Sequence, residues 1–522
     1  MCSDRSPQQS QALFTYPFFT SIGLTFMLDN KLPEFKADIN KAAHLCEVGQ
    51  WGEAIATCQA MLAQQPQNSN LYPGIWFEVW YQKGLAHKHL KQYSEAVEAF
   101  KRAVQLDSTH TDAWTQQMAS LMKLEAHAEI LAITDDLLST NPNNNYAWSY
   151  RGAALSRLMH HDKALEACDR AIKLNPDNDQ TWTHYGTALF HLKRFEESLV
   201  AYEKAIELNS ENSIAWANRG LVLSSLERYE ESIESYNASI SIDGDDDIVW
   251  TNRGDVLAKA GQSDEALISH NHAIELNPHR AYSWENQGQL LRKMQRYDEA
   301  LKSYRQAIEL NPDSGFAWKE QGWLLRKLER YNEALVSYNR AIELNSNDSY
   351  AWENRGWILR VLKQYDEALD AYDHAVDLKP DSDFAWRERG WILSRLKRYD
   401  EALDAYGHAI DLNPHSDRAW REQGSVFNEL RRHKEALESF DRALKLKPNC
   451  ETSSQSQAIL LDYLGQHEAA LGAFTRTLTI NNKNDMAWLH KGKILKRLGQ
   501  RQEALACFTR AIALNPQNEH NL

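Results

Sequence analysis

Three tryptophans spaced 34 residues apart, Trp323, Trp357 and Trp391, are the side chains in this sequence best suited to binding another molecule. Tryptophan is enriched at interaction hot spots, and an exposed row of aromatic side chains lowers solubility unless something covers it. Basic residues surround the three in the repeating pattern: Arg292, Lys293, Lys319, Arg326, Lys327, Arg360, Arg387, Arg395 and Arg421. The pattern favours binding of a partner segment with acidic or aromatic side chains. The alternative is that the basic side chains only shield the indoles through cation–π contacts.

Four asparagines are suited to a different contact, with an extended peptide backbone. Asn218, Asn252, Asn286 and Asn354 occupy one position in four of five successive 34-residue units. An amide side chain both donates and accepts hydrogen bonds, so a row of them can pair with a backbone whatever its side chains. The alternative is a row of solvated polar residues. The same position holds three acidic residues that interrupt the row: Glu320, Glu388 and Glu422.

These residues repeat because the chain itself repeats. Another tryptophan recurs in register at Trp80, Trp114, Trp148, Trp182, Trp216, Trp250, Trp284, Trp318, Trp352, Trp386, Trp420 and Trp488, and only Ser454 breaks the series. We number the unit so that this tryptophan is position 4, which places the asparagines at position 6 and the three central tryptophans at position 9. Self-similarity at a fixed period of this length predicts a helical repeat array.

Each unit has the pattern of two helices. In the unit 349–382, Trp352, Gly356 and Leu359 follow the i, i+4, i+7 spacing of one helical face. A second helix carries Ala368 and Tyr372 at similar spacing, and a proline ends it. One such hairpin cannot bury its apolar face alone, so neighbouring units must stack. If positions 4, 8 and 11 face the core, positions 2, 5, 6, 9, 12 and 13 lie on the opposite arc of the first helix.

The unit resembles the tetratricopeptide repeat. The small and large signature positions of that family are filled in one copy by Trp386, Gly390, Leu393, Ala402, Tyr406, Ala409 and Pro414. The resemblance implies an all-α, right-handed superhelical solenoid of tandem helix pairs, whose first helices line a concave groove where partners lie. It also makes the asparagine row similar to the asparagine ladder of peptide receptors in this family.

The repeats divide the chain as follows. Residues 1–34 lie outside the repeat and can be disordered, with Met27 as an alternative start; residues 35–68 form a first repeat, and residues 69–76 an insert loop that contains Pro73 and Gly74. Thirteen in-register repeats then span 77–518, with degenerate copies at 111–144 and 451–484, and a tail follows at 519–522. The second degenerate copy predicts a hinge near Ser454. The last repeat is not followed by a polar capping helix, which suggests self-association through the C-terminal end.

Composition narrows the function classes. The net charge of −14 and the pI near 5.8 argue against a nucleic-acid-binding surface as the main function. Six scattered cysteines without CxxC pairs indicate reduced thiols and a cytoplasmic protein. The apolar stretch 12–27 is too short and too polar to span a membrane.

Motifs for chemistry are missing from the pattern. The acidic run Asp243, Asp245, Asp246 and Asp247 lacks the spacing of a calcium loop, and the paired histidines lack metal-ligand spacing. No nucleophile, phosphate-loop or dinucleotide fingerprint occurs. We therefore expect no enzyme, no cofactor and no metal.

The sequence predicts a protein-interaction scaffold or adaptor that holds an extended segment of a partner in its groove, mainly between Ser213 and Cys450. Two alternatives remain at this point. Trp–Arg surfaces also suit base stacking, so the chain could be an RNA-binding helical repeat protein. It could equally be the non-catalytic regulatory subunit of an enzyme assembly.

Overall fold

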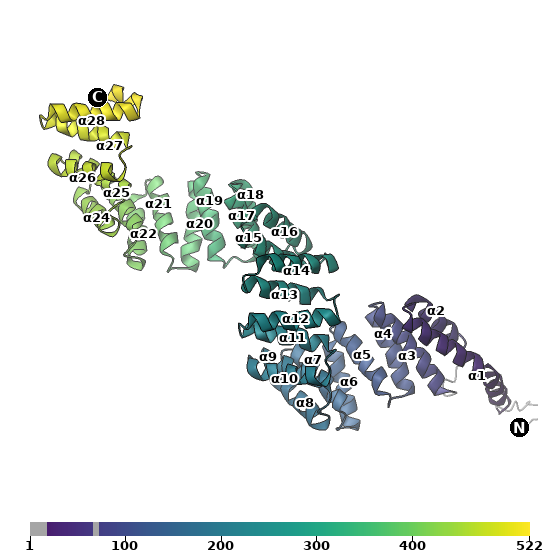
Figure 1. Cartoon of the computed structure of the whole chain (residues 1–522). Coiled ribbons are helices and arrows are strands. Elements are labelled where there is room, and N and C mark those ends of the chain that lie inside the picture. Colours follow the sequence, from purple (N-terminus) through teal and green to yellow (C-terminus); the bar gives the residue numbers. More distant parts are fainter. Residues whose placement is uncertain (1–17, 66–71, 522) are drawn as a thin grey trace, which may run out of the picture. The chain divides into compact units, whose positions relative to one another are not determined.

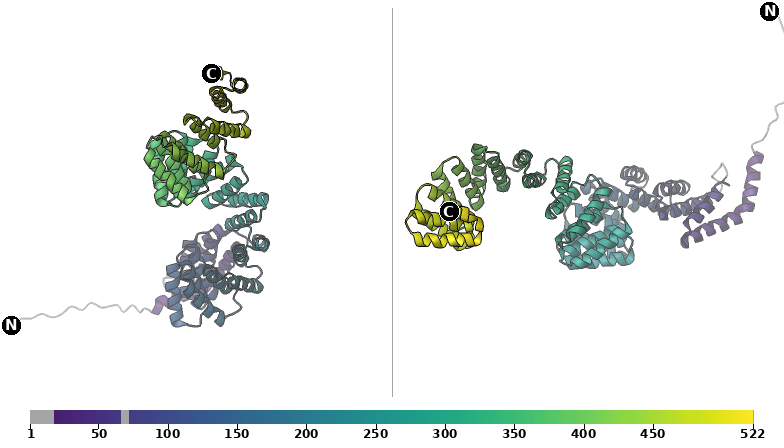
Figure 2. Two further views of the ribbon diagram at one scale, coloured as in Figure 1. Left: turned by 90° about the vertical axis from the view of Figure 1, so that its left-hand side faces the viewer. Right: turned by 90° about the horizontal axis from the view of Figure 1, so that it is seen from above.

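The computed structural model describes residues 18–65 and 72–521, which are helical with no strand among them. It consists of two compact units, unit 1 (Met1–Gln262) and unit 2 (Ser263–Leu522). Within each unit, antiparallel helix pairs stack on their neighbours in chain order (Figure 1). Figure 2 shows the same stacking from two further directions. The predicted all-α solenoid of tandem helix pairs is confirmed.

The helices of unit 1 are α1 (Phe18–Glu47), α2 (Trp51–Leu62), α3 (Pro73–His89), α4 (Tyr93–Leu106), α5 (Thr111–Lys123), α6 (His127–Thr140), α7 (Asn145–Arg157), α8 (His161–Leu174), α9 (Asp179–His191), α10 (Phe195–Leu208), α11 (Ser213–Ser225), α12 (Tyr229–Ile242) and α13 (Asp247–Lys259). Those of unit 2 are α14 (Ser263–Leu276), α15 (Ala281–Lys293), α16 (Tyr297–Leu310), α17 (Gly315–Lys327), α18 (Tyr331–Leu344), α19 (Ser349–Val361), α20 (Tyr365–Leu378), α21 (Asp383–Arg395), α22 (Tyr399–Leu412), α23 (Asp417–Glu429), α24 (His433–Leu446), α25 (Glu451–Tyr463), α26 (His467–Ile480), α27 (Asp485–Arg497), α28 (Arg501–Leu514) and the 3₁₀ helix η1 (Pro516–Asn521).

Side-chain caps define where most first helices begin. Asp348 and Ser382 accept the backbone N–H of Ala351 and Ala385, three residues into α19 and α21. The acidic run of unit 1 has the same role, because Asp246 accepts the N–H groups of Ile248 and Val249 at the start of α13. These turns are therefore helix caps.

A left-handed residue closes each first helix. Lys363 has a φ of 62°, and the next N–H, of Gln364, donates to the carbonyl of Leu359 at 2.9 Å. This is the six-to-one bond of a Schellman motif, which satisfies a carbonyl at the helix end. Glycine takes the same place at Gly261, Gly465 and Gly499.

The recurring position-4 tryptophan has a role other than filling the core. The indole N–H of Trp386 donates to the carbonyl of Pro380 at 2.9 Å, and that of Trp352 to the carbonyl of Ser346 at 3.0 Å. Equivalent bonds form at Trp148, Trp182, Trp216, Trp250, Trp284, Trp318, Trp420 and Trp488. The tryptophan thus stabilises the turn between successive 34-residue repeats, while the alanine before it is buried, as at Ala351 and Ala385.

The core between the two helices of one repeat is a tyrosine packed on a glycine. Tyr372 is fully buried, and a Cβ added to Gly356 would lie 3.0 Å from its ring. Even an alanine at the glycine would therefore require the ring to move by a few tenths of an ångström. The same pairing holds at Gly322 with Tyr338 and at Gly390 with Tyr406.

The N-terminal boundaries differ from those predicted. Helix α1 begins at Phe18, so residues 18–34 continue the first helix, and residues 1–17 lie outside the described part. Pro73 begins α3 and does not lie in a loop. Backbone N–H groups in the first helical turn have no acceptor within the helix, so a proline, which has no N–H, is well tolerated there. Trp76 is buried there, with its ring centroid 5.5 Å from that of Phe35.

The two degenerate copies pack differently. Helices α5 and α6 contact each other much less extensively than the flanking pairs α3–α4 and α7–α8. Helices α25 and α26 pack as closely as their neighbours, and Ser454 is buried with its hydroxyl donating to the carbonyl of Ala473 at 3.1 Å. The hinge near Ser454 stays a prediction.

Candidate partner-binding face

The predicted binding residues fall mostly on first helices of unit 2. Helix α15 carries Asn286, Arg292 and Lys293; α17 carries Lys319, Trp323, Arg326 and Lys327; α19 carries Asn354, Trp357 and Arg360; α21 carries Arg387, Trp391 and Arg395; α23 carries Arg421. The other two, Asn218 on α11 and Asn252 on α13, belong to unit 1. The asparagine row is therefore divided between the two units.

Each position-9 tryptophan is half-buried between two successive repeats. The ring centroid of Trp357 lies 5.9 Å from that of Tyr331, at the start of the preceding second helix. On its other side, the Arg326 guanidinium from the preceding first helix lies 4.9 Å from the indole centroid. Both Trp323 and Trp357 pack against the hydrophobic core of unit 2. Core packing therefore accounts for much of each indole, contrary to the expectation of a fully exposed row.

This arrangement occurs three times, and we call each copy a rung. The first rung is Arg292, Trp323 and Tyr297, with centroid distances from the indole of 5.0 Å and 5.9 Å. The second is Arg326, Trp357 and Tyr331. The third is Arg360, Trp391 and Tyr365, with distances of 4.9 Å and 6.0 Å. The rungs connect one first helix to the next, so the tryptophans and arginines form one continuous surface. The tyrosines share the 34-residue spacing, which was the available signal for a role that the sequence analysis missed.

Position 6 supplies a carboxylate to two of the rungs. Glu320 lies 3.1 Å from Arg292, and Glu388 lies 3.4 Å from Arg360. Burial raises the pKa of Glu320, against the opposing effect of Arg292 and Lys319. These glutamates, which the sequence showed only as interruptions of the asparagine row, are ion-pair partners within the chain.

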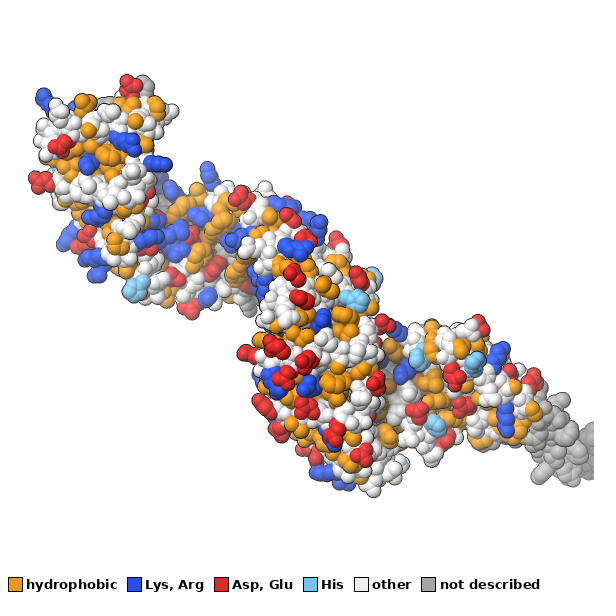
Figure 3. Space-filling view, in the orientation of Figure 1, with side chains coloured by type: hydrophobic (Ala, Val, Ile, Leu, Met, Phe, Trp, Pro, Cys, Tyr) orange, Lys and Arg blue, Asp and Glu red, His pale blue; other side chains and the backbone are white. Residues whose placement is uncertain are grey.

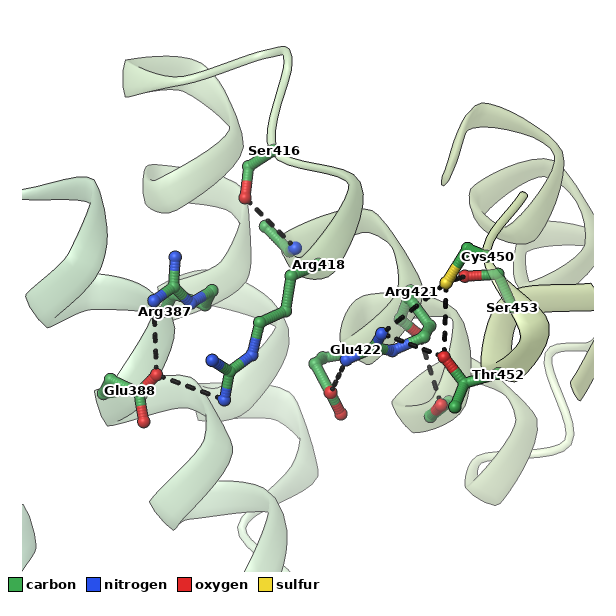
Figure 4. A network of polar contacts seen from close by, with 11 residues as sticks. Arg387, Glu388, Ser416, Arg418, Arg421, Glu422, Cys450, Thr452 and Ser453 are labelled. Atoms are coloured by element: carbon green, nitrogen blue, oxygen red, sulfur yellow. Dashed lines mark hydrogen bonds and ion pairs between the residues drawn. The ribbon is translucent and has the colours of Figure 1, made fainter. Parts of the chain in front are cut away.

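Glu388 has the most enclosed carboxylate of this face. Its side chain is 1% exposed, and the guanidinium groups of Arg387 and Arg418 each lie 3.3 Å from it (Figure 4). Arg360 lies 3.4 Å away on another side. Position 6 was predicted on the exposed arc, and Glu388 is instead at the centre of three arginines from three helices.

Asn354 is also buried, at 6% exposure, and its amide donates to the carbonyl of Tyr350 at 2.8 Å. Its donor is thus engaged within its own helix, which corrects the prediction of a fully exposed amide at this position. Asn218 and Asn252 are half-buried and make no side-chain hydrogen bond to the described part of the chain. Their pairing with a peptide backbone stays a prediction.

Position 5 connects one repeat to the capping residue of the next. Lys319 donates to Asp348 at 2.8 Å, and Glu353 accepts from Ser382 at 2.7 Å. Arg421 approaches the Cys450 thiol and donates to Thr452 at 3.1 Å. Lys319 and Arg421, predicted to contact a partner, therefore hold neighbouring repeats together.

Four of the nine predicted cations have no carboxylate partner within the described residues: Lys293, Arg326, Lys327 and Arg395. Lys327 lies 5.5 Å from the indole centroid of Trp323, and Arg395 lies 4.8 Å from that of Trp391. The shielding proposed as an alternative is thus present in the geometry. We call these four cations and the three rung tryptophans the basic face.

The comparisons with known proteins agree with this architecture. Sequence models described as tetratricopeptide repeat match residues 77–110, 146–178, 281–314 and 486–518, 319–383 and 387–449, 201–234, and 179–212 and 248–280. Together they cover more than half of the chain. The chain belongs to the tetratricopeptide-repeat family. A model of the protein prenyltransferase alpha subunit repeat matches residues 127–158, which comprise α6 of the loosely packed pair α5–α6 and the following α7.

Several solved structures are similar to parts of this tetratricopeptide-repeat chain. YrrB, described as a TPR protein with an unusual peptide-binding site, is 26% identical over 36% of this chain and 96% of its own, with a TM-score of 0.34. MamA is 20% identical over 32% and 92%, with a TM-score of 0.31. The Cut9–Hcn1 hetero-tetramer of the APC/C is 14% identical over 87% and 95%, with a TM-score of 0.39. The comparison with curated proteins gave no match.

Charge is segregated between the two helices of these tetratricopeptide repeats. Helices α15, α17, α19 and α21 together carry ten Lys and Arg against five Asp and Glu. The second helices α16, α18, α20 and α22 carry three against fourteen. Figure 3 shows basic side chains gathered over α21–α24 and acidic ones over α10–α12 on the side in view. The negative net charge therefore does not describe the basic face.

One thiol of the tetratricopeptide repeats is unusual. Cys450 precedes α25, and its sulfur lies 3.2 Å from the hydroxyl of Ser453 and 3.3 Å from that of Thr452 (Figure 4). Burial raises the pKa of Cys450, but hydrogen bonds from Ser453, Thr452 and Arg421 outweigh it and lower the pKa to about 7. Burial raises the pKa of Cys46, Cys58, Cys168 and Cys507, and all five described cysteines are free.

We expect Cys450 to be alkylated first among the five described cysteines when the folded protein is treated with iodoacetamide. Because the thiolate is the nucleophile, its rate should rise with pH through about 7, whereas an ordinary thiol rises near about 8.5. The measurement is residue-resolved mass spectrometry across this pH range. Ser453→Ala, which removes one donor, should move the midpoint upward. A midpoint of an ordinary thiol in the unaltered protein would contradict the prediction.

Other features of the described residues offer no stronger site. A hollow of about 400 Å³ in unit 1 is lined by Asp112, Tyr146, Asp179 and their neighbours. Two of its carboxylates are engaged within the chain, since Tyr81 donates to Asp112 and Asn212 donates to Asp179 at 2.8 Å. Over the described chain there is no cluster of three or more His, Cys, Asp or Glu that could hold a metal. No helix in the described ranges is long and apolar enough to cross a membrane.

Proposed function

We propose that this protein is an interaction scaffold that holds an extended, acidic segment of a partner protein on the basic face of unit 2. Tetratricopeptide-repeat proteins serve generally as protein-interaction scaffolds, and the finer assignment rests on this face. The observation that carries it is the combination of three half-buried tryptophans with four cations that lack a carboxylate partner. Unpaired positive charge beside partly exposed aromatic rings complements a segment with carboxylates and apolar side chains.

The geometry limits what this face can contribute. Because each indole is already packed on a tyrosine and an arginine, a partner contacts only its remaining edge. Lys293, Lys327 and Arg395 are exposed, so they contribute mainly to the rate at which an acidic partner associates and to the salt dependence of binding. No enzymatic step is part of the proposal.

The test uses a library of randomised peptides, selected against the full chain and then measured by fluorescence anisotropy. We expect the selected peptides to be acidic, and the variant Lys293→Glu/Lys327→Glu/Arg395→Glu to bind them about tenfold or more weakly, a loss of about 1.4 kcal/mol. The matched control, Lys302→Glu/Arg442→Glu/Lys445→Glu, changes three exposed cations on the second helices α16 and α24 by the same total charge. It should bind as the unaltered protein does.

Equal losses in both variants, or selection of peptides without acidic residues, would contradict the proposal. Binding to single-stranded RNA homopolymers tests the alternative function, RNA recognition. If they bind with steep salt dependence and the first triple variant abolishes that binding, the basic face is an RNA-binding surface instead.

A further inference from the structure

The three rungs of unit 2 differ at two positions: the second has Val361 where the others have Lys327 or Arg395 over the indole, and it has a different residue at position 6. In the first and third, a glutamate of the following repeat pairs with the stacked arginine, as Glu320 does with Arg292 and Glu388 with Arg360. In the second, the equivalent residue is Asn354. Arg326 therefore stacks on Trp357 without the carboxylate that its two counterparts have among the described residues.

Groups around Arg326 are left without hydrogen-bond partners. Its Nε is buried and makes no hydrogen bond, which is also true of the Nε of Arg292 and Arg360 in the other two rungs. Tyr338 is fully buried and its hydroxyl has no partner, as for the equivalent Tyr304 and Tyr372. Around the arginine, the second rung therefore differs only in lacking an ion-pair carboxylate beside these donors among the described residues. Burial raises the pKa of Tyr338, and Arg326 opposes that rise, so the guanidinium lies close enough to the hydroxyl to influence it. Buried donors without partners cost free energy until something accepts from them.

This rung has no acceptor from the described part of the chain where its counterparts have a glutamate. Asn354 is one methylene shorter than glutamate, and its amide is turned back to donate to the carbonyl of Tyr350 on its own helix. The first and third rungs show that this geometry accommodates a carboxylate beside an arginine stacked on indole. A guanidinium carries a rigid planar fork of donors, so one that is held beside an indole suits bidentate pairing with a carboxylate.

We propose, resting on the proposed function, that the second rung is a specific site for one carboxylate of the partner segment, an Asp or Glu side chain that pairs with Arg326. The position-6 residue then acts as the specificity determinant. Glutamate closes a rung by supplying the anion from within the chain, and asparagine leaves it open. The basic face would thus read one acidic residue at a fixed place, in addition to its general preference for acidic segments.

The substitution Asn354→Glu closes the second rung in the manner of its neighbours. With the randomised peptide library as the probe, we expect the unaltered protein to select peptides with Asp or Glu at one fixed position. Asn354→Glu should lose that selection and bind the same peptides about tenfold more weakly, while the rest of the peptide preference persists. Replacing that one peptide Glu by Gln should weaken binding to the unaltered protein by a similar factor and leave binding to Asn354→Glu unchanged.

Two further variants keep the test decisive. Glu320→Asn opens the first rung and should add a second acidic position to the selected peptides. Arg326→Gln removes the cation at a partly exposed site and should act like Asn354→Glu if the latter unfolds. If peptides bind but show no fixed acidic position, or if Asn354→Glu retains it, the carboxylate site is overturned while the scaffold function stands. If no peptide binds the unaltered protein, the proposed function fails with it.

Discussion

Replacing Tyr372 with alanine is expected to lower the free energy of unfolding of its repeat by about 3–5 kcal/mol. The ring is fully buried and fills the space left by Gly356, so truncation leaves a cavity between α19 and α20 that the glycine cannot fill. Because repeats of a solenoid open locally, the measurement is denaturant titration together with amide hydrogen exchange of α19 and α20 in the full chain.

The matched control is Tyr372→Phe. The Tyr372 hydroxyl is buried without a hydrogen-bond partner, so its removal should change stability by less than about 0.5 kcal/mol or raise it. The chain already uses phenylalanine at this position in other repeats, as in Phe440 and Phe474, both buried. A loss with phenylalanine as large as that with alanine would contradict this account and show that the hydroxyl is bonded.

The second large effect is expected at Glu388. Glu388→Gln keeps the shape of the side chain but removes the charge that three arginines share, at distances of 3.3–3.4 Å in a site that is 1% exposed. Removing one partner of a buried ion pair leaves uncompensated charge and typically costs about 3–5 kcal/mol. Denaturant titration should show this loss at low and at high salt, because a buried site is screened little.

Glu422 is the matched control for Glu388. It occupies the same position one repeat later, is 22% exposed on its side chain and pairs with Arg421 at 2.7 Å. Glu422→Gln should therefore cost less than about 1 kcal/mol. Similar losses at the two positions would mean that enclosure by three arginines has no special weight.

Local features that repeat in phase are enough to predict the fold. Gly356 and Tyr372, with the alanines around them, recur at a fixed spacing, and helix caps and, in most repeats, a proline mark the ends of the 34-residue repeat. Helix formation and hairpin packing depend on residues within one unit, which a single sequence displays directly. The exceptions, the start of α1 at Phe18 and the helical Pro73, lie where the repeat pattern is absent and only local propensity remains.

The candidate site was predicted in outline by the same periodicity. The tryptophan series and most of its basic residues do lie on adjacent first helices. The spacing also placed Arg292, Arg326 and Arg360 one unit apart, and the structure stacks each on the tryptophan of the next unit. What the pattern could not show was how much of each indole the neighbouring unit covers.

Only the tertiary structure decided which charges are free and which are paired. A helical period describes the faces of one helix, whereas Glu388 is buried by arginines from its own helix and from both neighbouring first helices. Net charge is a sum over the whole chain, so the acidic second helices outweigh the basic first helices α15, α17, α19 and α21 in that sum. The absence of an ion-pair partner for Arg326 has the same cause. Whether each of these arginines pairs with a carboxylate depends on a residue of the next repeat, and only the stacking of the repeats brings the two side chains together.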